Sequence, residues 1–287
     1  MLVRIATAAA MIPLVVALVW LAPPSLLAAV AAVVALLALA EFLDLGERIG
    51  ARAFRKWTMA CAAGLFYAQY SVGLIETHGM GWGVSILRYS GEATVSVETV
   101  FLIFLFGAAA IGAATRRPLH DVLPAMSLSA AGLLFIALPL SYLVRLNEIE
   151  SAGRQLVLFT LCLIWVGDMM AYFVGHFFGR VSLAPALSPK KTWEGAVGNF
   201  VGSLLVAVVF SHWMQADALT LLVIAGLANI AGQLGDLIES AYKRGAAVKD
   251  SSSLLPGHGG MLDRIDSLIF ASPVVWALYQ WLVIRGS

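Results

Sequence analysis

Long apolar runs separated by short polar connections make up most of the chain. Nine such runs predict membrane-spanning helices, because roughly 20 apolar residues in a helix cross the hydrocarbon core of a bilayer. They cover residues 5–22, 25–43, 58–76, 99–114, 125–145, 156–178, 199–215, 218–240 and 265–284. Period-two alternation of apolar and polar residues is absent, which argues against a membrane β-barrel. The pattern therefore predicts an all-α, polytopic integral membrane protein with about nine transmembrane helices.

The connections between these runs suggest one integrated membrane domain. Residues 1–155 would supply five spans, and residues 156–287 would supply four spans together with most of the polar motifs. Pro23 and Pro24 predict a tight hairpin between the first two spans, and residues 77–98 form the longest predicted loop. The first run also resembles a signal peptide, but it has no convincing cleavage site, so we expect an uncleaved first helix.

Composition supports the membrane assignment. The chain has 287 residues, of which 61% are hydrophobic and 12% are charged, and its mean hydropathy is +0.89. Soluble domains usually carry about 25% charged residues. The net charge of +1 does not indicate a partner, and we expect no nucleic acid. Cys61 and Cys162 both lie in apolar runs and indicate neither a disulfide nor a metal site.

Basic residues indicate the orientation in the membrane. A cytoplasmic N-terminus places 14 of the 18 Lys and Arg residues on the cytoplasmic side and 4 outside. The 14 are Arg4, Arg48, Arg52, Arg55, Lys56, Arg116, Arg117, Arg180, Lys190, Lys191, Lys243, Arg244, Lys249 and Arg264. The other four are Arg88, Arg145, Arg154 and Arg285. The positive-inside rule then predicts a cytoplasmic N-terminus and an external C-terminus in the cell (inner) membrane.

The eighth predicted span carries a polar face. Its members are Asn229, Gln233, Asp236, Ser240 and Lys243, at spacings of 4, 3, 4 and 3 residues. Such a face must contact protein or a water-filled cavity, since lipid cannot satisfy it. Hydrogen bonds between helices explain Asn229 and Gln233. Asp236, with Ser240 and Lys243 nearer the surface, is better explained as part of a metal and phosphate site. Glu239 lies one position off this face and is a weaker candidate.

A glycine-rich turn and two acidic residues precede and begin the ninth span. Gly259 and Gly260 allow backbone N–H groups to approach an anion, and His258 is either a phosphate donor or a structural turn residue. Asp263 and Asp266 are three residues apart and share a helix face. Acidic residues also offset the dipole at a helix start. A few carboxylates beside substrate phosphates are typical of Mg²⁺ sites, so we predict metal binding by both residues.

Basic residues around this turn are candidates for phosphate binding. Lys243, Arg244, Lys249 and Arg264 would face phosphate charge, although the positive-inside signal alone also explains them. Asp250 would orient the neighbouring Lys249 or bind a second ion. Together with Asp236, His258 and Asp263, these residues form our predicted catalytic set.

A second motif, SPKKTWEG, follows the sixth span at residues 188–195. We expect a loop here, with Ser188, Lys190, Lys191 and Thr192 binding substrate phosphate. Asp168 lies about 10 residues inside the preceding span, or roughly 15 Å from its end. A charge at that depth needs a partner or a cavity. Asp168 is therefore either a further metal ligand or the structural partner of a lysine of this motif.

The stretch from Ser240 to Asp266 resembles the signature of a known enzyme family. It reads S-x-x-K-R-x4-K-D-x5-P-G-H-G-G-x2-D-R-x-D and is similar to that of the phosphatidate cytidylyltransferases, also called CDP-diacylglycerol synthases. The likeness extends over residues 165–270. It implies the reaction of CTP with phosphatidate to give CDP-diacylglycerol and pyrophosphate, with one or two Mg²⁺ ions, in a polytopic homodimer. Asp236, Asp263 and Asp266 would hold metal, at a site facing the cytoplasm.

Three other classes of function compete with this reading. A purely structural membrane scaffold would tolerate Asp263→Asn with no loss beyond folding. A transporter would place ionisable residues along a path near the membrane midplane, whereas here they gather toward the predicted cytoplasmic face. A CTP-dependent lipid kinase would transfer phosphate alone, which the mass of the lipid product reveals. The sequence contains no P-loop, no HExxH and no paired CxxC motif.

Overall fold

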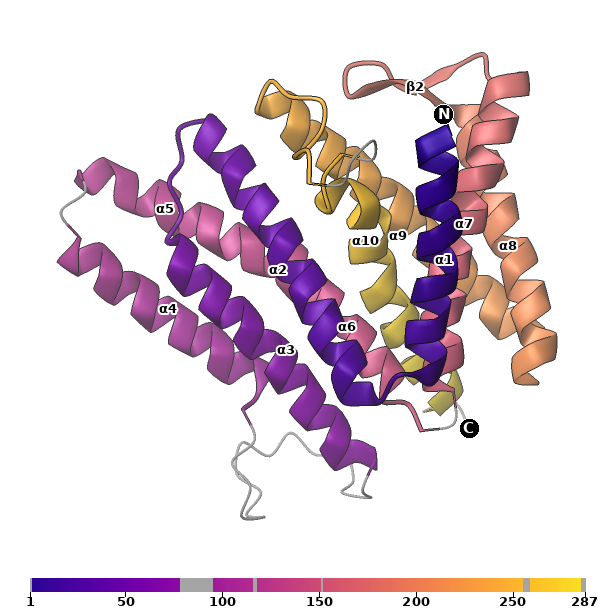
Figure 1. Cartoon of the computed structure of the whole chain (residues 1–287), viewed down its shortest axis with the longest axis horizontal. Helices are drawn as coiled ribbons and strands as arrows, with labels where there is room; N and C mark the ends of the chain where they lie inside the picture. Colours follow the sequence, from indigo (N-terminus) through magenta and orange to yellow (C-terminus); the bar gives the residue numbers. More distant parts are fainter. Residues whose placement is uncertain (1, 78–94, 116–117, 151, 255–258, 285–287) are drawn as a thin grey trace. The chain divides into compact units, whose positions relative to one another are not determined.

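The computed structural model describes residues 2–77, 95–115, 118–150, 152–254 and 259–284. Within these ranges the protein is helical apart from one short β-hairpin (Figure 1). The chain forms two compact units, one of Ala22–Gly153 and one of Met1–Leu21 together with Arg154–Ser287. The predicted all-α class is confirmed for the described residues.

The unit of Ala22–Gly153 is a bundle of packed helices. They are α2 (Pro24–Arg48), α3 (Arg55–Thr77), α4 (Val97–Ala114), α5 (Leu119–Gly132) and α6 (Leu138–Asn147). Helix α3 contacts α2, α4, α5 and α6, so it occupies the middle of the bundle. The side chains of Leu39, Leu43, Leu65 and Leu133 are fully buried and form its core.

A five-residue π-helical segment, η1 (Leu133–Ala137), joins α5 to α6 without a break. Pro139 is the second residue of α6, two positions after η1. A proline has no N–H to donate and its ring collides with the carbonyl of the preceding turn. A π-helical turn relieves both problems by widening the helix locally. Residues 119–147 therefore remain one apolar helix despite the proline.

The second unit carries the polar motifs. It contains α1 (Leu2–Leu21), α7 (Gly153–Phe178), β1 (Ser182–Ala184), β2 (Ser188–Thr192), α8 (Trp193–Met214), α9 (Ala218–Gly245), α10 (Leu262–Tyr279) and the π-helical η2 (Gln280–Ile284). Helix α9 packs against both α8 and α10 (orange and yellow in Figure 1). The α9 N-terminus is fixed by Asp217, whose side chain accepts a hydrogen bond of 2.8 Å from the Thr220 N–H.

Small residues bring α7 and α8 close together. A Cβ atom added at Gly198 would lie 2.8 Å from the Val174 Cβ and 3.1 Å from the Met170 carbonyl oxygen. Only glycine fits at that separation. Close approach through small residues is the usual way that helices associate in membranes, where lipid is as apolar as the side chains it would replace.

Seven helices in the described ranges are long and apolar enough to cross a membrane. All nine predicted spans fall on helices, but α1 and α3 are not among the seven. The multi-pass character is therefore supported, while the count of nine and the orientation remain predictions.

The predicted loop at residues 188–195 has regular structure, which corrects the sequence-based expectation. Ser188–Thr192 is strand β2, and it pairs with β1 in antiparallel register, Ser182 opposite Thr192 and Ala184 opposite Ser188. The Thr192 hydroxyl then caps α8 by accepting a hydrogen bond of 3.1 Å from the Gly195 N–H. The lysine pair of the motif therefore lies on a hairpin strand whose end is fixed to α8.

Candidate active site

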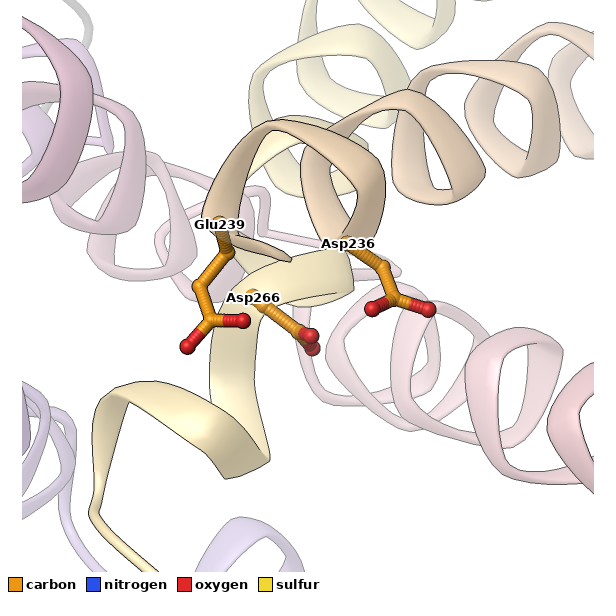
Figure 2. Close-up of side chains that lie close together, drawn as sticks. All are labelled: Asp236, Glu239 and Asp266. Atoms are coloured by element: carbon orange, nitrogen blue, oxygen red, sulfur yellow. The ribbon is translucent and has the colours of Figure 1, made fainter. Parts of the chain in front are cut away.

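Three carboxylates from α9 and α10 converge at one point. Asp236, Glu239 and Asp266 each offer one oxygen, and these oxygens all lie within 4.8 Å of one another. Figure 2 shows the two α9 side chains and the α10 side chain directed toward the same region. We call these residues the carboxylate group. Two of its members were predicted as metal ligands, and Glu239 was the weaker candidate beside the polar face.

Local sequence explains why these side chains meet. Asp236 and Glu239 are three residues apart, so they share a face of α9. Gly235 lets α10 approach closely, since a Cβ atom there would lie 2.6 Å from the Asp266 carbonyl oxygen. The Asp266 carboxylate is in turn held by its own helix, where it accepts a hydrogen bond of 2.7 Å from the Ser267 N–H. The carboxylate group depends on this close helix packing.

The donor set of the carboxylate group fits a hard divalent cation. Carboxylate oxygens are the preferred protein ligands of Mg²⁺ and Ca²⁺, and like charges held this close require a counter-ion. Two ammonium groups approach from the edges, Lys191 at Asp236 and Lys243 at Glu239. The carboxylate group and Asp263, which also pairs with Lys243, together hold four carboxylates, and the ion pairs bring two lysines to them. The excess of two negative charges matches a divalent ion.

Strand β2 brings the first of these lysines to the site. The Lys191 ammonium forms an ion pair with the Asp236 carboxylate, and the two side chains are 29% and 31% exposed. Lys190 precedes it on the strand and is exposed, as expected for alternating side chains. Ser188 begins the strand and Thr192 ends it. The lysine motif and the polar face of α9 therefore belong to one site.

Lys243 joins the carboxylate group to the segment before α10. Its ammonium lies 2.5 Å from Glu239 Oε2 and 2.5 Å from Asp263 Oδ1. The other Asp263 oxygen accepts hydrogen bonds from the Ser251 N–H at 2.9 Å and from the Gly260 N–H at 2.7 Å. The structure thus places Asp263 next to the carboxylate group and engages both of its oxygens in protein contacts.

Asp263→Asn is expected to lower the free energy of unfolding by about 3 kcal/mol, because it leaves the Lys243 ammonium with one partner in a buried setting. The side chains of Lys243, Glu239 and Asp263 are only 13%, 4% and 6% exposed. Thermal unfolding of the purified chain in detergent measures the effect. Asp250→Asn is the control, since Asp250 is exposed. Equal midpoints for the two variants would contradict a structural role for Asp263.

The remaining predicted residues lie around this centre or outside the described ranges. Ser240 is buried on α9, whereas Arg244, Lys249 and Asp250 are exposed. Arg244 donates hydrogen bonds to the carbonyl oxygens of Leu187, at 3.2 Å, and Val248, at 3.0 Å, so it ties the hairpin turn to the end of α9. His258 lies outside the described residues.

Gly259 takes a backbone conformation that favours glycine, with φ at +82°. This conformation lets the chain turn so that the next N–H, that of Gly260, points at Asp263. In this structure the Gly260 N–H serves the Asp263 carboxylate. Its predicted role in phosphate binding stays a prediction.

Asp168 on α7 lies close to the site. It interacts electrostatically with Asp236, Lys191 and Arg264, and its Oδ1 accepts a hydrogen bond of 3.1 Å from Asn199 Nδ2. It is not a member of the carboxylate group. Sequence reasoning named Lys190 or Lys191 as its partner, and the structure favours Lys191.

Asn199 is the residue that sequence reasoning missed. It is buried on α8, where it contacts both Asp168 and Asn229. The only sequence signal was a single amide in an apolar run, which is common in membrane helices. For Glu239, the available signal was its spacing, three residues after Asp236 and four before Lys243.

Comparison with known proteins gives a consistent result. The sequence model of the Cytidylyltransferase family matches residues 2–282. The phosphatidate cytidylyltransferase of Haemophilus influenzae is 46% identical over 137 residues, 46% of this chain and 48% of that protein. The Bacillus subtilis enzyme of the same name is 40% identical over 147 residues, 50% of this chain and 55% of that protein. The chain spans about half the length of these two relatives.

A third relative aligns over more of its length. The phosphatidate cytidylyltransferase of Rickettsia prowazekii is 30% identical over 209 residues, which are 70% of this chain and 90% of that protein. The likeness therefore extends well beyond the motifs of the second unit.

Proposed function

The chain belongs to the cytidylyltransferase family, and we propose that it transfers the CMP group of CTP to phosphatidate, giving CDP-diacylglycerol and pyrophosphate. The observation that carries this proposal is the carboxylate group with its two lysines, which lie within residues 165–270, the part of the chain that resembles the family. Acidic residues for a metal ion and basic residues for phosphates are the parts that such a transfer needs.

The reaction requires little acid–base chemistry. A phosphomonoester carries most of its second negative charge near neutral pH, because its second pKa is about 6. A phosphate oxygen of phosphatidate attacks the α-phosphorus of CTP, and the bond from that phosphorus to the bridging oxygen of the β-phosphate breaks. The electron pair leaves with pyrophosphate. The difficulty is to hold two anions together, so the protein's task is to position them and to neutralise charge.

Asp236, Glu239 and Asp266 are the residues that fit a divalent ion best. Asp263, also predicted as a ligand, lies beside them through Lys243. Such an ion, expected to be Mg²⁺, supplies charge stabilisation for phosphate oxygens when bound. Asp168 would act through Lys191 rather than as a ligand.

The basic residues around the carboxylate group would hold the phosphates. They come from the hairpin, from the end of α9, from the segment between α9 and α10 and from the start of α10, and are Lys190, Lys191, Arg244, Lys249 and Arg264. Arginine binds phosphate through a planar fork and lysine through a single charged point. When pyrophosphate leaves, the β- and γ-phosphates carry more negative charge than they did in CTP. These cations therefore favour its departure.

We further propose that the N-terminus and this site face the cytoplasm, where CTP is available, and that the chain acts as a homodimer. The distribution of basic residues supports the orientation. The homodimer rests on the family resemblance alone. Accessibility of introduced cysteines near Lys190 to membrane-impermeant reagents tests the orientation.

The test of the function is the mass of the lipid product. The purified full chain, in phosphatidate-containing vesicles with CTP and Mg²⁺, should give a lipid that has gained a CMP group, and one pyrophosphate per lipid. A lipid that gains only phosphate would instead identify a CTP-dependent lipid kinase. No change in lipid mass would contradict both enzymes.

A further inference from the structure

Three side-chain amides connect α9, α8 and α7 in one row. Gln233 Nε2 donates to Asn229 Oδ1 at 2.6 Å, and Asn229 Nδ2 donates to Asn199 Oδ1 at 2.6 Å. Asn199 Nδ2 then donates to Asp168 Oδ1 at 3.1 Å. We call Gln233, Asn229 and Asn199 the amide row. Each amide nitrogen donates to the next oxygen along the row, from Gln233 toward α7, and the last acceptor is the Asp168 carboxylate.

This arrangement fixes the orientation of each amide. The oxygen of Asn199 accepts from Asn229, so its N–H group must face Asp168. Asn229 also donates to Ser203 Oγ at 2.6 Å, which anchors the row to a second α8 side chain. Asn199, Asn229 and Ser203 are only 8%, 3% and 0% exposed. Buried hydrogen bonds in a membrane helix bundle hold a single geometry, because breaking one leaves a polar group unsatisfied.

A glycine on α7 makes room for the end of the row. A Cβ atom at Gly167 would lie 2.2 Å from Asn199 Oδ1 and 3.0 Å from Ser203 Oγ. Asp168 can therefore reach Asn199 only because the residue before it, Gly167, has no side chain. The contacts among Asn199, Asn229 and Ser203 already join α8 to α9. Attachment of α8 to α9 alone does not require the further bond to Asp168.

The other surroundings of Asp168 are the charged groups of the candidate site. It is repelled by the like charge of Asp236 and attracted, more weakly, by the opposite charges of Lys191 and Arg264. Lys191 therefore forms a direct ion pair with Asp236 and also attracts the Asp168 carboxylate electrostatically. We propose that the amide row positions the Asp168 carboxylate as a counter-charge for Lys191, so that Asn199 is a positioning residue for the phosphate-binding lysine.

This inference rests on the proposed function in one respect, the role of Lys191 in holding CTP phosphate. In this proposal Asp168 is the counter-charge of Lys191. Asn199 acts on the substrate only indirectly, through Asp168 and Lys191. At metal sites, loss of an outer residue that orients a ligand typically costs 10- to 100-fold in affinity or activity, and we expect a loss of similar size here. The loss should appear mainly in the affinity for CTP, since the metal-binding carboxylates are untouched.

Asn199→Ala should raise the KM for CTP about tenfold, with kcat changed less than threefold. Ser203→Ala is the matched control, because Ser203 is buried on the same helix and contacts the same Asn229 without reaching Asp168. Both variants should lose similar thermal stability in detergent, but Ser203→Ala should keep the wild-type KM. Equal changes in KM for both variants, or none in Asn199→Ala, would overturn the proposal.

A side-chain exchange separates positioning from simple structure. Asp168→Asn combined with Asn199→Asp keeps a carboxylate–amide hydrogen bond but moves the charge from α7 to α8. We expect this double variant to regain stability relative to Asp168→Asn while its affinity for CTP stays about tenfold weaker than wild type. Full recovery of CTP affinity would show that Asp168 is only a structural partner of Asn199.

Binding of CTP, measured by titration calorimetry without phosphatidate, keeps this test independent of catalysis. If wild type binds CTP but forms no CDP-diacylglycerol, the proposed function fails and the exchange still decides the role of Asp168. If wild type does not bind CTP, the proposed function and this inference both fail.

Discussion

Asp236→Asn should lower Mg²⁺-dependent release of pyrophosphate by about a thousandfold, the largest effect we expect from a single substitution. Asp236 is the one residue that belongs to the carboxylate group and also pairs with the hairpin lysine Lys191. The amide that replaces it carries no charge, so the divalent ion loses a ligand and the ammonium loses its direct partner. Pyrophosphate release from CTP and phosphatidate, measured over a range of Mg²⁺ concentrations, gives the result.

The control for this substitution lies on the same helix. Asp217→Asn changes an exposed carboxylate at the other end of α9, where it only caps the helix. An asparagine is also a good cap, so activity should stay within about twofold of wild type. Binding of Mn²⁺, followed by electron paramagnetic resonance, should weaken in Asp236→Asn and stay unchanged in Asp217→Asn. Wild-type Mn²⁺ binding by Asp236→Asn would show that this residue is not a metal ligand.

The sequence predicted the helices and most of the charged residues that meet at the candidate site, because polar residues in a membrane helix are costly. Asp236 was a clear candidate since a carboxylate on a membrane helix needs a partner or an ion. The same logic placed Lys191 at the site through its motif. In the structure these two residues form an ion pair, although 45 positions separate them along the sequence. Their pairing follows from the hairpin, which the sequence reading took for an irregular loop.

The parts that sequence reasoning did not predict depend on contacts between helices. Asn199 is an ordinary amide in the sequence, and its importance comes from α7 and α9 on either side. Asp263 was expected to bind metal on the basis of its spacing from Asp266. The structure instead surrounds it with Lys243 and with backbone N–H groups of the preceding segment. A spacing of three residues indicates that two side chains share a helix face, but it does not indicate which groups pack against that face.

Gly235→Ala is expected to reduce activity about a hundredfold, although no catalytic group changes. The new Cβ atom would lie 2.6 Å from the Asp266 carbonyl oxygen and 2.7 Å from Phe270 Cδ2. Helix α10 must therefore move away from α9 at the position of Asp266. This displacement separates one carboxylate from the other two, and catalytic geometry tolerates shifts of only about 1 Å. Pyrophosphate release and Mn²⁺ affinity should fall together.

Gly232→Ala, one helical turn earlier, distinguishes this local effect from general loss of packing. Its Cβ atom would lie 3.3 Å from the Ser267 carbonyl oxygen, a contact that small adjustments relieve. Overpacking costs about 1–3 kcal/mol of stability, so both variants should unfold at lower temperature than wild type. Only Gly235→Ala should lose Mn²⁺ affinity in its folded fraction, because only that position lies opposite Asp266. Equal Mn²⁺ affinities in the two variants would mean that the carboxylate group does not depend on the approach of α9 to α10 at this point.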